Sequence, residues 1–205
     1  MPNTTESRRK ELVGVFREAS DCSRCGLSES RTQVVFGAGD ADADLMLVGE
    51  APGAEEDRQG LPFVGRSGAL LTKLLAEAGL PRERVFIANT LKCRPPENRD
   101  PRPEEIETCR PWLDEQIRLI QPRVIATLGN FATKLLSGDP TGITKVRGVP
   151  QLRTLGGRTV FLYPLFHPAA ALRATGTADL LRRDINALPD LLQRDPVDAT
   201  TGVTQ

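Results

Sequence analysis

This 205-residue chain has no excess of charge of either sign, and it lacks long apolar runs. The 27 basic and 27 acidic residues give a formal net charge of zero, which argues against extensive non-specific nucleic-acid binding and leaves room for a small basic footprint. No apolar run approaches the roughly 20 residues that span a bilayer. The first residues contain no apolar signal core, so we expect a cytoplasmic protein that does not bind membranes.

Aromatic residues and histidine are also scarce. One tryptophan, one tyrosine and no flavin or nicotinamide fingerprint argue against a redox carrier. The single histidine, His167, is flanked by Phe166 and Pro168, which would hold it rigidly. A neutral imidazole there could donate to an oxygen that gains negative charge. The alternative is a buried histidine satisfied by the backbone.

Short apolar runs alternate with helical patterns along the chain. The runs predict strands covered on both faces, at Leu45–Val48, Val85–Asn89, Val124–Leu128 and Thr159–Tyr163. The helical patterns lie at Ser67–Ala78, Pro103–Ile120, Phe131–Leu136 and Asp179–Leu192. This order predicts an α/β fold, a three-layer α/β/α sandwich with a central four-stranded parallel sheet. We expect one domain over residues 1–205, with loose termini at about 1–8 and 195–205.

Polar residues follow the predicted strands. Glu50, Asn89 and His167 each end or follow a different strand, so they should meet at one edge of the sheet, where α/β proteins bind ligands. The segment 49–65, GEAPGAEEDRQGLPFVG, is either part of that pocket or a solvated acidic loop. Asn89 could read the donor and acceptor edge of a pyrimidine, or simply turn the chain. Phe63 could stack on a flat ring or pack the loop onto the core.

Two further segments suit phosphate. Gly65-Arg66-Ser67-Gly68 opens a predicted helix, where free amides and an arginine could bind phosphate, although an ordinary cap by Ser67 fits equally. It is not a Walker loop, because no GK[ST] follows. Arg147, followed by Gly148, could be a phosphate contact or only a turn.

The four cysteines are Cys22, Cys25, Cys93 and Cys109. Disulfides are improbable in the expected compartment. A two-residue-spaced pair plus two further thiols suits a single four-thiolate site for zinc or an iron–sulfur cluster, and the spacing does not separate the two. The alternative is a chance pair with two buried thiols.

Several separated motifs resemble the family 4 uracil-DNA glycosylases, the iron–sulfur members of that superfamily. The motifs are Gly49-Glu-Ala-Pro-Gly53, Pro62-Phe-Val-Gly65, Asn89, Lys92-Cys-Arg-Pro-Pro96 and His167-Pro168. Their order and spacing are consistent with the family from about Cys22 to Arg173, which is most of the chain.

The resemblance implies a structural [4Fe-4S] cluster on the four cysteines. It also implies that Phe63 stacks on a flipped-out uracil, that Asn89 reads its polar edge, and that His167 donates to its charged oxygen. Glu50 and Ala51 would line the pocket floor near the attacking water, with Pro52 and Glu56 in the same binding set. Either glutamate could balance charge on the sugar or orient the water.

The chain also departs from its relatives. Ala51 stands where the best-known members of the superfamily carry a water-activating Asp, which family 4 also lacks. The wedge leucine of relatives falls near Ala171, so Leu172 could take that role. The segment Asn89–Cys93 lacks the basic, histidine-containing insert of a branch that links covalently to DNA, so turnover is expected. The expected DNA contacts are Arg66, Ser67, Arg147, Ala171, Leu172 and Arg173.

The sequence thus predicts a monofunctional base excision repair glycosylase that acts on uracil in single- or double-stranded DNA. We expect a monomer, cytoplasmic and nucleoid-associated when on DNA. The alternatives are activity on other deaminated bases, a non-catalytic binder of damaged DNA, and an iron–sulfur redox protein.

Overall fold

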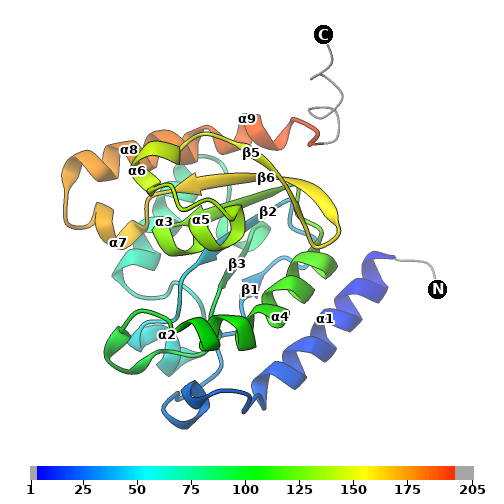
Figure 1. Cartoon of the computed structure of the whole chain (residues 1–205). Helices are drawn as coiled ribbons and strands as arrows, with labels where there is room; N and C mark the ends of the chain where they lie inside the picture. The colour runs from blue at the N-terminus through cyan, green and yellow to red at the C-terminus, as the bar shows by residue number, and fades with distance from the viewer. Residues whose placement is uncertain (1–3, 197–205) are drawn as a thin grey trace.

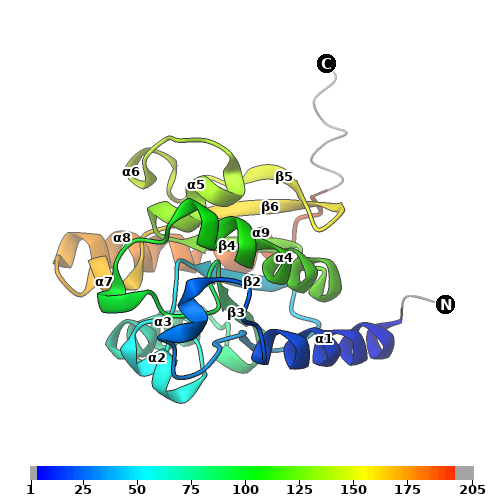
Figure 2. The same ribbon diagram turned by 60° about the horizontal axis from the view of Figure 1, so that its bottom comes forward.

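The computed structural model describes residues 4–196 and confirms the predicted α/β sandwich (Figure 1, Figure 2). In that part of the chain six strands form one sheet, in the order β1-β3-β2-β4-β6-β5. The four central strands are parallel, as predicted, and each edge strand is antiparallel to its neighbour. The strands are β1 (Ala38–Gly39), β2 (Leu45–Gly49), β3 (Phe86–Asn89), β4 (Val124–Leu128), β5 (Gln151–Leu155) and β6 (Arg158–Leu165).

The two edge strands were not predicted, because neither is an apolar run. β1 has two residues, and β5 is mostly half-buried with polar side chains. A two-residue turn joins β5 to β6, and its residues Gly156 and Gly157 have φ of 59° and 78°. This conformation is typical of a tight hairpin turn and favours glycine at both places.

Helices cover both faces of the sheet. The first face carries α1 (Thr5–Ser20), α4 (Pro103–Ile120) and α5 (Asn130–Ser137). The second carries α3 (Arg66–Glu77), α8 (Thr175–Asn186) and α9 (Leu188–Leu192). Shorter helical elements in the connections are η1 (Gly26–Glu29), α2 (Ala54–Gln59), η2 (Arg82–Arg84), η3 (Pro96–Asn98), α6 (Ile143–Val146) and α7 (Pro168–Ala171).

Strand β2 shows why the central strands are continuously apolar. Leu45 and Leu47 pack in the core beneath α3 and α8, whereas Met46 and Val48 pack in the core beneath α1 and α4. None of these four side chains is more than 2% exposed. Both faces of the strand are therefore buried, as expected for a parallel sheet between two helical layers.

Two predictions about the ends of the chain need correction. Residues 5–8 are not loose but form the first turn of α1, which begins after the capping residue Thr4. The apolar pattern of this helix is weak in the sequence, because only Leu12 and Ala19 of α1 are buried. The predicted helix Asp179–Leu192 is two helices, since Pro189 at the start of α9 cannot continue the hydrogen bonding of α8. Most of the predicted loose segment 195–205 lies outside the described residues.

No helix within residues 4–196 is long and apolar enough to cross a membrane.

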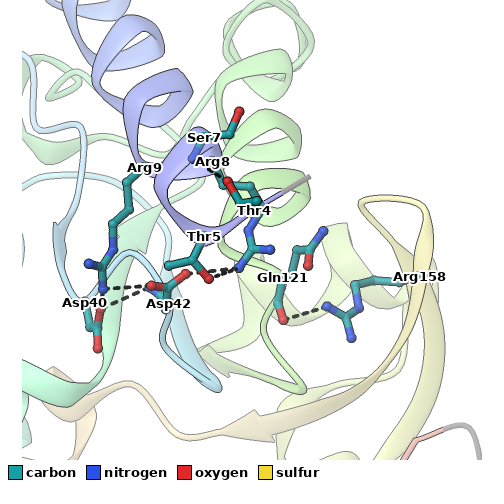
Figure 3. A network of polar contacts seen from close by, with 9 residues as sticks. All are labelled: Thr4, Thr5, Ser7, Arg8, Arg9, Asp40, Asp42, Gln121 and Arg158. Carbon is teal, nitrogen blue, oxygen red and sulfur yellow. Dashed lines mark hydrogen bonds and ion pairs between the residues drawn. The ribbon is translucent and has the colours of Figure 1, made fainter. Parts of the chain in front are cut away.

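Ion pairs fix the start of α1 to the loop before β2 (Figure 3). Arg8 Nη2 lies 3.0 Å from Asp42 Oδ1, and Arg9 Nη2 lies 2.7 Å from Asp42 Oδ2. Arg9 also reaches Asp40 at 3.6 Å. Because α1 packs on α4 and leads directly to Cys22, these ion pairs help to place that cysteine.

We predict that Asp42→Ala lowers the free energy of unfolding by roughly 1–2 kcal/mol, because it leaves the partly buried Arg8 without its carboxylate. Urea unfolding measures the loss, and hydrogen exchange should show faster opening of α1. Lys10→Ala is the matched control, since its pair with Glu6 is about three-quarters exposed at both side chains and should contribute almost nothing. Equal stability of the two variants would contradict the prediction.

Candidate active site

A cavity of about 650 Å³ opens at the carboxyl edge of the parallel strands, where open α/β sheets bind ligands. Glu50 follows β2, Asn89 ends β3 and His167 follows β6, so the polar residues meet at this edge. The residues predicted to bind or process a base all line the cavity: Glu50, Ala51, Pro52, Glu56, Phe63, Asn89 and His167.

Asn89 is a buried polar residue whose acceptor has no partner. Its side chain is 2% exposed, and no described residue hydrogen-bonds its Oδ1. An unsatisfied buried acceptor costs roughly 1–3 kcal/mol. Gly49 makes this placement possible, because a Cβ there would overlap Asn89 Oδ1 and would lie 2.8 Å from Phe63 Cζ. The missing side chain at residue 49 therefore leaves the room that the Asn89 carboxamide and the Phe63 ring occupy.

Phe63 is held in a strained turn beside Asn89. Its φ of 50° lies in the left-handed region, which costs a non-glycine residue about 1–2 kcal/mol. Glu56 Oε1 accepts hydrogen bonds from the amides of Val64 and Gly65, both at 3.2 Å. Arg82 Nη2 donates to the carbonyl of Pro62 at 2.5 Å. Hydrogen bonds with Glu56 and with Arg82 therefore hold the turn in place, and Glu56 Oε1 is already engaged by two of them.

His167 faces Phe63, with ring centroids 5.7 Å apart. Its Nδ1 accepts a hydrogen bond from the amide of Ala169 at 3.1 Å, so the neutral ring carries its proton on Nε2. Burial lowers the pKa of His167, and the nearby charge of Glu56 opposes this only in part. The imidazole is therefore neutral at pH 7, with Nε2–H as a donor.

Glu50 is half-buried in the same cavity. Burial raises its pKa, and the charge of Asp100 raises it further. Asp100 comes from the loop that contains η3, which sequence reasoning did not place in the site. Asn98 and Arg99 of that loop also line the cavity. Pro95 and Pro96 favour a turn at the start of η3, but nothing in the sequence shows where that turn points.

Arg99 fixes this loop to the start of α4. Its guanidinium forms two hydrogen bonds with the Glu105 carboxylate, at 2.9 and 2.5 Å. Glu105 Oε2 also accepts from the amide of Arg102, the capping residue of α4. Arg94 Nε donates to Asn98 Oδ1 at 2.8 Å. Side-chain hydrogen bonds therefore hold in place the part of the cavity wall that this loop forms.

The predicted DNA contacts differ in how exposed they are and in whether they line the cavity. Ser67 and Arg173 line the cavity, Arg66 is exposed beside it, and Leu172 is 42% exposed. Ala171 is only 6% exposed, so it packs inside and cannot protrude as a wedge.

Arg147 is also not free to meet a phosphate as predicted. Its guanidinium forms an ion pair with the buried Asp184 and lies 5.5 Å from the centre of the Phe166 ring. It braces the segment before His167 onto α8.

The four cysteines line one hollow beside the cavity, together with Trp112. Cys22 and Cys25 follow α1, Cys93 follows β3 and Cys109 lies within α4. Among the described residues, no group of three or more Cys, His, Asp or Glu is arranged to hold a single metal ion. Four thiol donors around one hollow are a ligand set that either zinc or an iron–sulfur cluster can use.

Cationic side chains surround these thiols. Arg31 Nη1 donates to Cys93 Sγ at 3.4 Å, and Lys92 N donates to Cys109 Sγ at 3.2 Å. Burial raises the pKa of Cys93 to about 11 and also raises that of Cys109. Burial lowers the pKa of Lys92 to about 8, and the two neighbouring cysteines oppose that shift. Positive groups thus lie where thiolates bound to a metal would need them.

Comparison with known proteins agrees with this geometry. The model of the uracil DNA glycosylase superfamily matches residues 36–189. A type-4 uracil-DNA glycosylase of Thermotoga maritima is 48% identical over 80% of this chain and 85% of its own. A type-4 uracil-DNA glycosylase of Sulfurisphaera tokodaii is 43% identical over 88% of this chain and 84% of its own. A type-5 uracil-DNA glycosylase of Thermus thermophilus is 38% identical, over only 50% of this chain.

Identity of this level over most of both chains, together with the superfamily match, shows the family. The chain belongs to the uracil DNA glycosylase superfamily, within its type-4 uracil-DNA glycosylases.

Proposed function

We propose that the protein removes uracil from DNA by hydrolysing its N-glycosidic bond and leaving an abasic site. The observation that carries this proposal is Asn89, a buried carboxamide that lines the cavity beside Phe63 and whose Oδ1 has no hydrogen-bond partner among the described residues. Uracil presents an N3–H donor next to a carbonyl acceptor, which a carboxamide can match with its oxygen and its NH₂. With the carboxamide held in that orientation, cytosine would place its N3 acceptor against Asn89 Oδ1 and its amino group against the NH₂, so neither hydrogen bond would form.

A base inside a duplex cannot be reached by water, so the nucleotide must be extruded into the cavity. Phe63 would stack on the ring of the extruded base. When the glycosidic bond breaks, its electron pair leaves with uracil N1, and negative charge develops on the carbonyl oxygens. His167 Nε2–H would donate to the charged oxygen, and the Ala169 amide keeps the ring in the tautomer that can do so.

Water then adds to the cationic C1′ of the sugar, and the proton that it releases passes through solvent to the uracil anion, which gives neutral uracil and an abasic sugar. Of the two candidate glutamates, the structure favours Glu50 for balancing this charge and orienting the water. Glu56 Oε1 is bound to two backbone amides of the Phe63 turn, whereas Glu50 lines the cavity with a raised pKa. We assign Glu56 to holding Phe63 in place.

DNA would lie along the rim of the cavity. Arg66 and Ser67 begin α3, where backbone amides and an arginine suit a phosphate. Arg173 also lines the cavity, and the exposed Leu172 beside it can enter the space that an extruded base leaves. Action on single- or double-stranded DNA, a monomeric state and a cytoplasmic location remain predictions.

We further propose that Cys22, Cys25, Cys93 and Cys109 hold a [4Fe-4S] cluster. The support is the set of four thiol donors around one hollow with cationic neighbours. The cluster would fix the segment after α1 and the segment after β3 to α4, and so place the loop of η3 at the cavity. Its contribution is structural.

The first prediction concerns Asn89. A labelled oligonucleotide with one dU should give abasic product, and one with only thymine should not. Asn89→Ala should lower kcat/KM on the dU substrate by about 10²-fold or more, because the matched oxygen and NH₂ are lost. Leu191→Ala, in the core at α9, controls for lost stability. Wild-type rates in Asn89→Ala would remove Asn89 from recognition, and no product from iron-loaded wild type would favour a damage binder.

The second prediction concerns His167. His167→Ala should lower kcat about 10²- to 10³-fold, and His167→Gln should lose less activity, because a carboxamide still donates.

Burial lowers the pKa of His167 in the folded protein below the usual 6.5, so unfolded His167 binds a proton at a higher pH than folded His167. Wild type should therefore lose stability as pH falls below about 6.5, and His167→Gln should lose less. Parallel pH curves for the two proteins would contradict this.

The third prediction concerns the cysteine site. Wild-type protein should contain about four irons and four sulfides per chain, with absorption in the visible range. Cys93→Ser should lower iron content and thermal stability together, whereas Leu191→Ala, which changes no cysteine, should keep its iron content. Full iron content in Cys93→Ser would exclude Cys93 as a ligand.

A further inference from the structure

Lys92 is among the largest side chains that are completely buried in the described part of the chain, at 1% exposure. Its Nζ donates to the carbonyl oxygen of Asn89 at 2.8 Å and to Gln116 Oε1 at 2.6 Å. Neither acceptor carries a charge. Burying an ammonium group is costly, and methionine would fill a similar volume without that cost. A role in packing alone therefore does not account for lysine here.

Gln116 makes this contact rigid. It lies in α4, is fully buried, and its Nε2 donates to the carbonyl of Phe36 at 2.8 Å. Both ends of its carboxamide are therefore engaged, so it cannot turn away from Lys92. The Phe36 ring lies 5.9 Å from Lys92 Nζ and closes the same space. The ammonium thus joins the end of β3 to α4 and to the segment before β1.

Lys92 also contacts the cysteine site through its backbone. Its amide donates to Cys109 Sγ at 3.2 Å, and the next residue is Cys93. One residue therefore fastens the main chain of Asn89 at one end and a cysteine sulfur at the other. Asn89 Oδ1 has no partner of its own among the described residues, so the position of its carboxamide depends on the main chain that carries it.

We propose that Lys92 and Gln116 are positioning residues for base recognition, which hold the main chain of Asn89 and link its place to the cysteine site. This inference rests on the proposed reading of uracil by Asn89. Without the ammonium, the carbonyl of Asn89 loses its donor, and the carboxamide is less well aligned with the polar edge of the base. Misalignment of this kind costs rate although the residue touches no substrate.

The test is a double-mutant cycle on iron-loaded protein. Lys92→Met should keep its iron content and visible absorption, yet lower kcat/KM on the dU oligonucleotide by about 10- to 100-fold. It should weaken preferential binding of dU over thymine oligonucleotide to a similar degree. In an Asn89→Ala background the same substitution should cause little further loss, because Lys92 acts through Asn89. Equal losses in both backgrounds, or wild-type kinetics, would overturn the proposal.

Gln116→Leu and Gln116→Glu keep the test decisive if Lys92→Met fails to fold or to bind iron. Glutamate loses the donor to Phe36 but retains an acceptor for Lys92, whereas leucine loses both, so glutamate should lose less than leucine in rate and in dU binding. An equal loss in the two Gln116 variants would argue against the relay. Leu191→Ala controls for lowered stability. If wild type released no uracil, the proposed hydrolysis would fail, but dU binding by the same variants would still decide the positioning role.

Discussion

The close approach of β2 and β3 at their carboxyl ends is the constraint on which the site depends. Their parallel register pairs Gly49 with Asn89. Because residue 49 has no side chain, the Asn89 carboxamide and the Phe63 ring can occupy the space above it. Any larger residue would displace one of them. The recognition geometry therefore follows from strand pairing and one glycine, and the surrounding loops complete it.

Much of this could be predicted from the sequence. The central strands are short apolar runs, which identifies them whatever their partners are, and parallel strands must end at a common edge. That is why Glu50, Asn89 and His167 could be placed together. β1 and α1 could not be placed, because two strand residues and a helix with two buried side chains leave no periodic signal.

The sequence says least about side chains whose partners lie far away along the chain. Arginine is a residue type that often contacts phosphate, but the guanidinium of Arg147 pairs with Asp184, which lies 37 positions away along the chain. The direction of the η3 loop depends on the contact of Arg99 with Glu105. A sequence pattern shows how residues are spaced along the chain, but it does not show which charged groups come into contact in the folded protein.

Glu50 shows how the same environment can favour the reaction. Burial and the charge of Asp100 make its carboxylate less favourable in the free protein, which is why its pKa is raised. A sugar that becomes positive as the glycosidic bond breaks would supply the opposite charge that this carboxylate lacks. The interaction then strengthens most at the transition state, and only such differential binding increases the rate of the chemical step. An exposed carboxylate is already stabilised by water and would gain less. In the proposed reaction, the burial that disfavours the Glu50 carboxylate beforehand would therefore strengthen its interaction with the developing positive charge.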